Sequence, residues 1–256
     1  MIGALRARGV RGMRAGSEPI SSGDTVIPVK ADSPSRAMPV VTIFLILMNV
    51  AAYFWQASLG PEEHYGVLRW GLTPIELRGV VTYAHGGFDA KPILTIFTSM
   101  FLHGHLLHLA ANMLFLWIFG ATVEHALGPL RFLAFYLITG TVGALTQVFT
   151  MANPTVPMIG ASGAVSGVLG GYLVLRPYGR IHTLIPLFFY MPIIRIPALL
   201  FLAAWFVVQL VSSATTHGDN GAGIAFLAHI GGFVAGVILV TPLSRARPFR
   251  IARIFR

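Results

Sequence analysis

The chain has 256 residues, of which 55% belong to the hydrophobic set and 11% are charged. An ordinary soluble domain carries about 25% charged residues, so the composition excludes that class and indicates an integral membrane protein. The 18 Lys and Arg residues against 9 Asp and Glu give a net charge of +9. The chain has no cysteine, which excludes a disulfide framework, a thiol nucleophile and any Cys-ligated metal site.

The first 38 residues are rich in Gly, Ser and Pro and contain Arg6, Arg8, Arg11 and Arg14. They lack an apolar run of the length found in a signal peptide. We expect residues 1–38 to form a flexible basic tail in the cytoplasm. An Arg-rich, acid-poor start also fits an organellar transit peptide, and this alternative stays open.

Six apolar stretches follow in chain order, at residues 40–59, 106–123, 130–151, 164–175, 196–211 and 224–240. A bilayer core of about 30 Å needs about 20 helical residues, and the fourth stretch is shorter than that. The fifth has an ambiguous start, although Pro197 suits a first helical turn. We predict an all-α polytopic membrane protein with a six-helix membrane domain over residues 39–243 and a second basic cytoplasmic tail at 244–256.

The basic residues are distributed unevenly across this arrangement. With the N-terminus inside, 15 of the 18 fall on the cytoplasmic side, and only Arg69, Arg78 and Lys91 lie outside. Short cytoplasmic loops collect Lys and Arg, so both termini are expected in the cytoplasm. The asymmetry accounts for the net charge without a nucleic acid partner, and the tails are expected to attract anionic lipids. The connection 60–101 then lies outside, and its length indicates a functional or partly structured segment.

Four polar residues stand out: Ser162 at the outer end of the fourth predicted span, His229 within the sixth, and His108 and Asn112 four residues apart on one face of the second. Polar groups inside a membrane are expensive, so each is a functional candidate. On each helix, a charged residue marks the cytoplasmic edge of the membrane. At a rise of about 1.5 Å per residue, the four polar residues lie about 18 to 24 Å from that edge. Four polar groups from three helices are therefore expected at one level, closer to the outer surface.

The short fourth span is explained if its helix begins near Ser162. The loop 152–161 must then dip into the protein, which is tolerated only where it is buried or lines water. A helix start provides free N–H groups and a positive dipole end for a developing anion. Small residues recur every four positions in the fourth and sixth spans, at Gly163, Gly167 and Gly171 and at Ala228, Gly232 and Gly236. This spacing predicts that the two helices touch.

These positions suit acyl transfer. A serine hydroxyl needs a base to take its proton, and an imidazole is the usual base. Spans four to six contain no acid, so Ser162 and His229 would form a dyad and not a triad. His108 and Asn112, with the backbone N–H of Ser162, would hold the oxyanion. The arrangement fits amide hydrolysis.

Three motifs together resemble the bacterial rhomboid intramembrane serine proteases: Gly-x-Ser-Gly at 160–163, Ala-His-x-Gly-Gly at 228–232, and His-x-x-x-Asn at 108–112. The resemblance covers about residues 40–243. It implies a multi-pass protein of the bacterial inner membrane that cleaves transmembrane proteins without a cofactor, with Ser162 as nucleophile, His229 as base, and His108 and Asn112 as oxyanion donors. The residues expected to support this site are Gly160, Gly163, Ser166, His103, Gly232 and Gly236.

The sequence departs from the family at two places. The family often has a Trp-Arg pair in the first outer loop, where this chain has Leu94-Thr95. It commonly has an aromatic residue four positions after the serine, where this chain has Ser166. That aromatic ring would pack against the catalytic imidazole.

Other mechanisms fit the sequence less well. His103, His105 and His108 cluster before the second span, but the His-Glu-x-x-His spacing of a metalloprotease is absent, and no metal is expected. No carboxylate pair lies within the spans for an aspartyl mechanism. We expect His103 to line the water cavity, His105 to lie at the interface, and Glu124 to be structural.

Two other classes of function remain as alternatives. A non-proteolytic rhomboid-like factor would bind membrane proteins or take part in their quality control, and would be expected to lack the nucleophile or the base. A proton-coupled transporter would suit His229, but the spans lack intramembrane acids.

Overall fold

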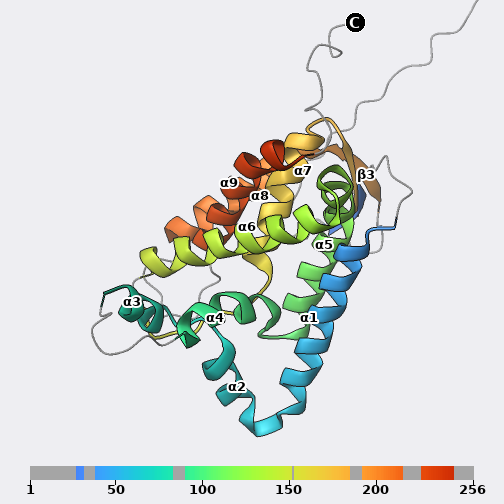
Figure 1. Ribbon diagram of the computed structural model, residues 1–256. Helices are drawn as coiled ribbons and strands as arrows, with labels where there is room; N and C mark the ends of the chain where they lie inside the picture. Colours follow the sequence, from blue (N-terminus) through green and yellow to red (C-terminus); the bar gives the residue numbers. More distant parts are fainter. Residues whose placement is uncertain are drawn as a thin grey trace, which may run out of the picture.

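The computed structural model describes residues 27–31, 38–82, 90–151, 153–184, 192–215 and 226–244. The protein is mostly helical (Figure 1). Its apolar helices are α1 (Val40–Ser58), α5 (Leu106–Leu127), α6 (Pro129–Thr150), α7 (Ser162–Leu175), α8 (Ala198–Thr215) and α9 (Phe226–Leu243). Each of these helices overlaps one predicted apolar stretch, so the prediction of an all-α polytopic bundle is confirmed.

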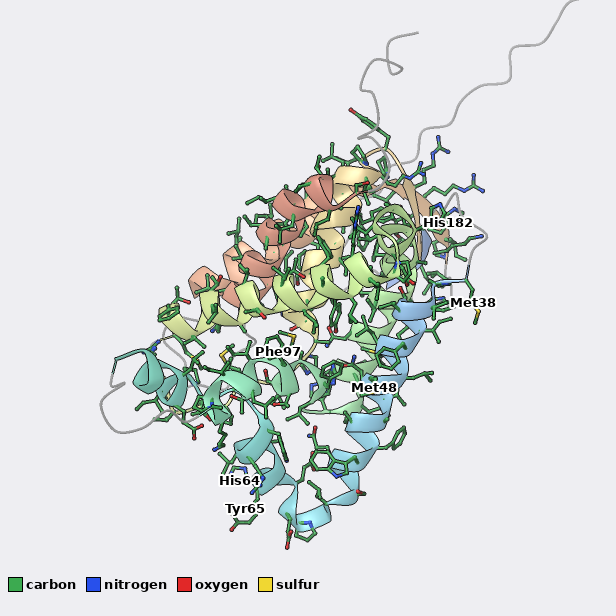
Figure 2. The ribbon with its side chains drawn as sticks, in the orientation of Figure 1. Met38, Met48, His64, Tyr65, Phe97 and His182 are labelled. Carbon is green, nitrogen blue, oxygen red and sulfur yellow. The ribbon has the colours of Figure 1, made fainter. Side chains whose placement is uncertain are left out.

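Within the described residues, four helices are long and apolar enough to cross a membrane, namely α1, α5, α6 and α9. Helix α7 has 14 residues, and the apolar part of α8, Ala198–Val211, is also shorter than a full span. The count of six spans therefore stays a prediction. Exposed apolar and aromatic side chains such as Met38, Met48 and Tyr65 lie on the surface of the molecule (Figure 2).

A small sheet at one end of the bundle was not predicted. Strands β1 (Ile27–Ala31), β2 (Arg180–Leu184) and β3 (Ile193–Pro197) pair antiparallel in the order β1-β2-β3. The sheet lies at the end where α1 begins and α9 ends (Figure 1). Residues 27–31 therefore belong to the folded part and not to a tail. The expectation that Pro197 occupies the first turn of a helix is wrong, because Pro197 ends β3 and α8 starts at the next residue.

The long connection after α1 lies at the opposite end and is partly structured, as predicted. It contains the short 3-10 helices η1 (Gly60–Glu62) and η2 (Ser99–Phe101) and the helices α2 (Glu63–Trp70), α3 (Pro74–Thr82) and α4 (Lys91–Thr98). Arg78 of α3 donates from Nε to the carbonyl of Val148 at 2.8 Å and from Nη2 to the carbonyls of Val148 and Met151. It thereby satisfies free carbonyls at the C-terminal end of α6.

Glu124 of α5 is buried and satisfies the first turn of α1. Its carboxylate accepts hydrogen bonds from the backbone N–H groups of Val41 and Thr42, at 2.9 and 2.8 Å, and from the Thr42 hydroxyl at 2.8 Å. A carboxylate at a helix N-terminus is favoured by the free N–H groups and the dipole. The structural role expected for Glu124 is confirmed by these contacts.

Helices α7 and α9 pack with their backbones in contact, as the spacing of small residues predicts. A Cβ atom on Gly232 would lie 2.0 Å from the carbonyl oxygen of Gly163, and one on Gly236 would lie 2.0 Å from that of Gly167. No side chain fits at either position. Helix α7 is also packed against α5 and α6, so its residues from Gly163 to Tyr172 are buried.

The first prediction concerns this contact. Gly236→Ala places a methyl group on the Gly167 carbonyl, so α9 must move away from α7, and we expect a loss of about 1–3 kcal/mol or more in the free energy of unfolding. Gly163→Ala is the matched control, because the nearest neighbour of its Cβ would lie at 3.6 Å. Thermal unfolding in detergent measures both variants. Equal melting temperatures for the two would contradict the close packing.

Candidate active site

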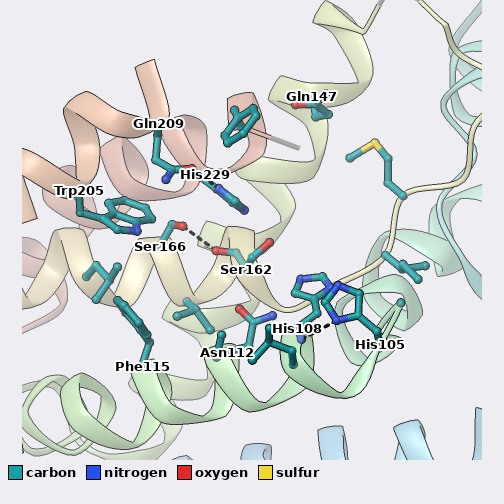
Figure 3. A pocket seen from close by; sticks show the side chains of 18 of the residues that line it. His105, His108, Asn112, Phe115, Gln147, Ser162, Ser166, Trp205, Gln209 and His229 are labelled. Carbon is teal, nitrogen blue, oxygen red and sulfur yellow. Dashed lines mark hydrogen bonds between the residues drawn. The ribbon is translucent and has the colours of Figure 1, made fainter. Parts of the chain in front are cut away.

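A cavity of about 620 Å³ is lined by residues of α5, α6, α7, α8 and α9 and of the segments before α5 and α7 (Figure 3). Ser162, His229, His108 and Asn112 all line it. Ser166, which was expected to support the site, lines it as well. The structure thus brings together the four polar residues that the sequence placed at one depth.

Ser162 is the first residue of α7, as predicted from the shortness of that helix. The loop that leads to it is fastened to the long connection. The backbone N–H of Gly160 donates to the Ser99 carbonyl at 2.8 Å, and Leu72 and Met158 exchange hydrogen bonds at 2.8 and 3.0 Å. These bonds satisfy the irregular backbone just before the helix and fix the position at which α7 begins.

Gly160 allows His108 to approach this loop. Its φ is +127°, a conformation that side chains disfavour. A Cβ atom at Gly160 would lie 2.8 Å from Cε1 of His108 and 3.8 Å from Oγ of Ser162. The imidazole of His108 and the hydroxyl of Ser162 therefore both lie beside Gly160, on the side where a side chain would stand.

Helix α9 brings His229 to the same cavity. His229 is buried, and the carbonyl of Ala228, the residue before it, lies 3.6 Å from the Cβ position of Gly163. The neighbours of Ser162 and His229 are thus in contact. Within the described residues, no hydrogen bond joins Ser162 to His229. Catalytic hydrogen bonds are often long before substrate binds.

Two residues of α8 that the sequence analysis did not single out lie against His229. Nδ1 of His229 is 2.6 Å from Oε1 of Gln209, and the Trp205 ring centroid is 6.2 Å from that of His229 (Figure 3). A polar residue within the fifth apolar stretch is itself a signal, and Trp205 lies four residues earlier on the same face. The ring expected four positions after the serine is absent, since Ser166 instead donates its hydroxyl to the Ser162 carbonyl at 2.6 Å.

Asn112 faces the cavity with an unused donor. Its side chain is buried, and Nδ2 has no hydrogen-bond partner among the residues that the structure describes. An unpaired buried donor costs about 1–3 kcal/mol, so such a group in a cavity wall indicates a place for an acceptor from a ligand. At the start of the same helix, the exposed His105 accepts from the backbone N–H of His108 at 3.1 Å.

His103 does not line the cavity, so that expectation is wrong. It is fully buried, its ring centroid lies 5.1 Å from that of His108, and Nδ1 lies 3.3 Å from the Phe101 carbonyl. Gln56 of α1 fixes its backbone on both sides, with hydrogen bonds of 2.9 and 3.2 Å. These contacts turn His103 inward, behind His108.

The same burial decides the charge of His103. Burial, followed by repulsion from His108, lowers the pKa of His103 to about 4. The ring is therefore neutral at pH 7 and brings no positive charge to the site. Among the described residues, no group of three His, Asp or Glu side chains is arranged to hold a metal ion.

Comparisons with known proteins agree on one family. The Rhomboid domain model matches residues 91–246. Rhomboid protein 1, mitochondrial, of Saccharomyces cerevisiae is 32% identical over 159 residues, 60% of this chain and 42% of that protein. RHOMBOID-like protein 5 of Arabidopsis thaliana is 32% identical over 145 residues, 56% of this chain and 42% of that protein.

A bacterial relative aligns over more of the chain. Rhomboid protease AarA of Providencia stuartii is 28% identical over 218 residues, which are 78% of this chain and 70% of that protein. The matches to the yeast and plant relatives span less than half of their lengths. The family model covers more than half of this chain and includes all four polar residues of the cavity. The chain belongs to the rhomboid family.

Proposed function

We propose that this protein is an intramembrane serine endopeptidase that hydrolyses peptide bonds in or near transmembrane segments of other membrane proteins. One observation carries the proposal. One cavity is lined by a serine at the start of a helix, a buried histidine from the helix packed against it, and a buried amide donor that has no partner within the described part of the chain. Nucleophilic catalysis on an amide needs these three elements: a nucleophile, a base and an oxyanion donor.

The reaction follows from these positions. Nε2 of His229 takes the proton of the Ser162 hydroxyl as Oγ attacks the carbonyl carbon of the substrate. The tetrahedral intermediate collapses when the protonated His229 gives its proton to the leaving amine. Water then enters through the cavity, loses a proton to His229 and attacks the acyl carbon. His229 returns that proton to Oγ of Ser162 as the bond to the acyl group breaks and the acid is released. No cofactor or metal takes part in this scheme.

The oxyanion of the intermediate would lie between α5 and the start of α7. Asn112 Nδ2 and His108 approach from α5, and the backbone N–H of Ser162 is free because it belongs to the first turn of α7. The dipole of α7 adds to the stabilisation. The donors are held by packing before substrate arrives, which is what makes such groups effective.

We further propose the bacterial inner membrane as the location, with residues 39–243 as the membrane domain and both termini in the cytoplasm. The distribution of Lys and Arg supports this orientation, and the bacterial relative aligns over most of the chain. The cavity would then lie near the outer surface. Transmembrane proteins are the substrates, and the basic ends of the chain face anionic lipids.

The second prediction tests the nucleophile and the base. Purified protein in detergent should react with a fluorophosphonate probe and cleave a transmembrane substrate, whereas Ser162→Ala and His229→Ala should do neither, because the first removes the attacking oxygen and the second removes its base. Ser244→Ala, at the end of α9 and outside the cavity, is a control expected to keep full labelling. An unlabelled, inactive wild type would favour the non-proteolytic alternative.

The third prediction concerns Asn112. Asn112→Ala should lower kcat by about 10²–10³, the cost of one oxyanion donor, with KM nearly unchanged because the interaction forms mainly in the transition state. Thr122→Ala is the matched control, since it also removes from α5 a buried polar group that has no partner in the described ranges, and Thr122 does not line the cavity. Steady-state kinetics on both variants provide the measurement. A loss confined to KM would place Asn112 in substrate binding instead.

The fourth prediction concerns the substrate. An intact helix keeps its carbonyls in internal hydrogen bonds, so it must unwind locally before Ser162 can attack. Transmembrane segments with Gly or Pro near the scissile bond should therefore be cleaved faster than uniform Leu-rich segments of the same length. Cleavage rates for such a matched pair in liposomes provide the comparison. Equal rates would exclude local unwinding as a requirement.

A further inference from the structure

Helix α8 provides the side chains that lie against His229 on the far side from Ser162. Gln209 and His229 are each 8% exposed, and Oε1 of Gln209 lies 2.6 Å from Nδ1 of His229. We propose that Gln209 is a positioning residue, which orients His229 so that Nε2 is the free base toward Ser162. This inference rests on the proposed function and adds a third member to the dyad.

The hydrogen bond fixes the tautomer of the histidine. A carboxamide oxygen can only accept, so Nδ1 of His229 carries the hydrogen and Nε2 is left with its lone pair. Nε2 is then the atom that can take a proton from the Ser162 hydroxyl. A triad carboxylate performs the same orientation and also stabilises the imidazolium. Gln209 provides the orientation without the negative charge.

The surroundings of His229 show why this support comes from α8. On α7, the position four residues after Ser162 is Ser166, whose hydroxyl is bonded to the Ser162 carbonyl at 2.6 Å. Trp205 lies on the same helix as Gln209, and Phe226 lies on α9, with ring centroids 6.2 and 6.3 Å from His229. Rings limit the space open to the imidazole, but among these neighbours Gln209 provides the hydrogen bond to Nδ1.

Helix α8 is held to α9 by aromatic contacts. The ring centroids of Trp205 and Phe206 lie 6.0 and 4.8 Å from that of Phe233, which is one turn from His229 on α9. The other side of α8 is exposed at residues such as Val207 and Val208. The orientation of His229 therefore depends on the packing of α8 against α9, because this packing places Gln209 beside Nδ1 of His229.

The fifth prediction tests this role with two substitutions. Gln209→Met keeps the length of the side chain but replaces the carboxamide oxygen with a thioether sulfur, which is only a weak acceptor. The rate of fluorophosphonate labelling and kcat should therefore both fall by about 5- to 100-fold, between the loss of one hydrogen bond and the loss of a triad orienter. KM should stay within about twofold, because His229 acts in the chemical step. Val208→Ala, on the exposed side of α8, is the matched control and should behave as wild type.

Gln209→Glu provides the rescue. A carboxylate accepts the same hydrogen bond, so labelling should return toward the wild-type rate, and the acidic limb of the pH profile should move to higher pH because a negative charge favours the protonated imidazole. If the side chain at position 209 did not contact the imidazole, that limb would stay in place.

The outcomes separate this inference from the proposed function. If the wild-type protein is not labelled and does not cleave a substrate, both the proposed function and the role of Gln209 are wrong. An active wild type with Gln209→Met labelled at the wild-type rate overturns the role of Gln209 alone. If thermal unfolding in detergent shows that Gln209→Met does not fold, the pH profile of Gln209→Glu provides the test. A pH profile identical to that of wild type then overturns the proposal, and a shifted acidic limb supports it.

Discussion

The absence of two Cβ atoms on α9 determines where the site can form. The carbonyl oxygens of Gly163 and Gly167 occupy the space that side chains at Gly232 and Gly236 would need. Lipid provides no hydrophobic force between helices, so close backbone packing of this kind is what holds them together. Ser162 precedes Gly163, and His229 lies three residues before Gly232. The separation of the proposed nucleophile and base is therefore set by backbone packing, before either side chain forms a hydrogen bond.

Helix α7 is short, so its first residues must be held in place inside the protein. The loop before Ser162 is bonded to Ser99 and Leu72, and the connection that contains them is fastened to the end of α6 through Arg78. The long outer connection thus supports the helix start that bears Ser162. Irregular backbone near a membrane needs such partners, since unpaired polar groups there cost several kcal/mol. Without the connection, the loop before Ser162 would lose the backbone hydrogen bonds to Ser99 and Leu72.

Much of this arrangement could be predicted from the sequence, because the membrane restricts what each residue type can do. Apolar length located the helices, glycine spacing predicted the contact between α7 and α9, and depth along the helices grouped Ser162 with His229. Pairing of 27–31 with 180–184 was missed, since strand partners so far apart leave no local pattern. The inward turn of His103 depends on Gln56, a contact between distant segments. The contact of Gln209 with His229 could not be predicted either, because it depends on how α8 is rotated about its own axis, which the sequence of α8 does not show.

Gln209, Trp205 and Phe226, which contact His229 among the described residues, are all uncharged, and their chemistry suits a buried site. Farther from the ring, His103 lies behind His108 and is neutral at pH 7 because burial lowers its pKa to about 4. A carboxylate placed at this depth would need to be desolvated at a cost of several kcal/mol. A carboxamide orients the imidazole at a far smaller cost of burial, but it leaves the imidazolium without a counter-charge. Stabilisation of the transition state must then come mainly from the oxyanion side, where Asn112, His108 and the start of α7 converge.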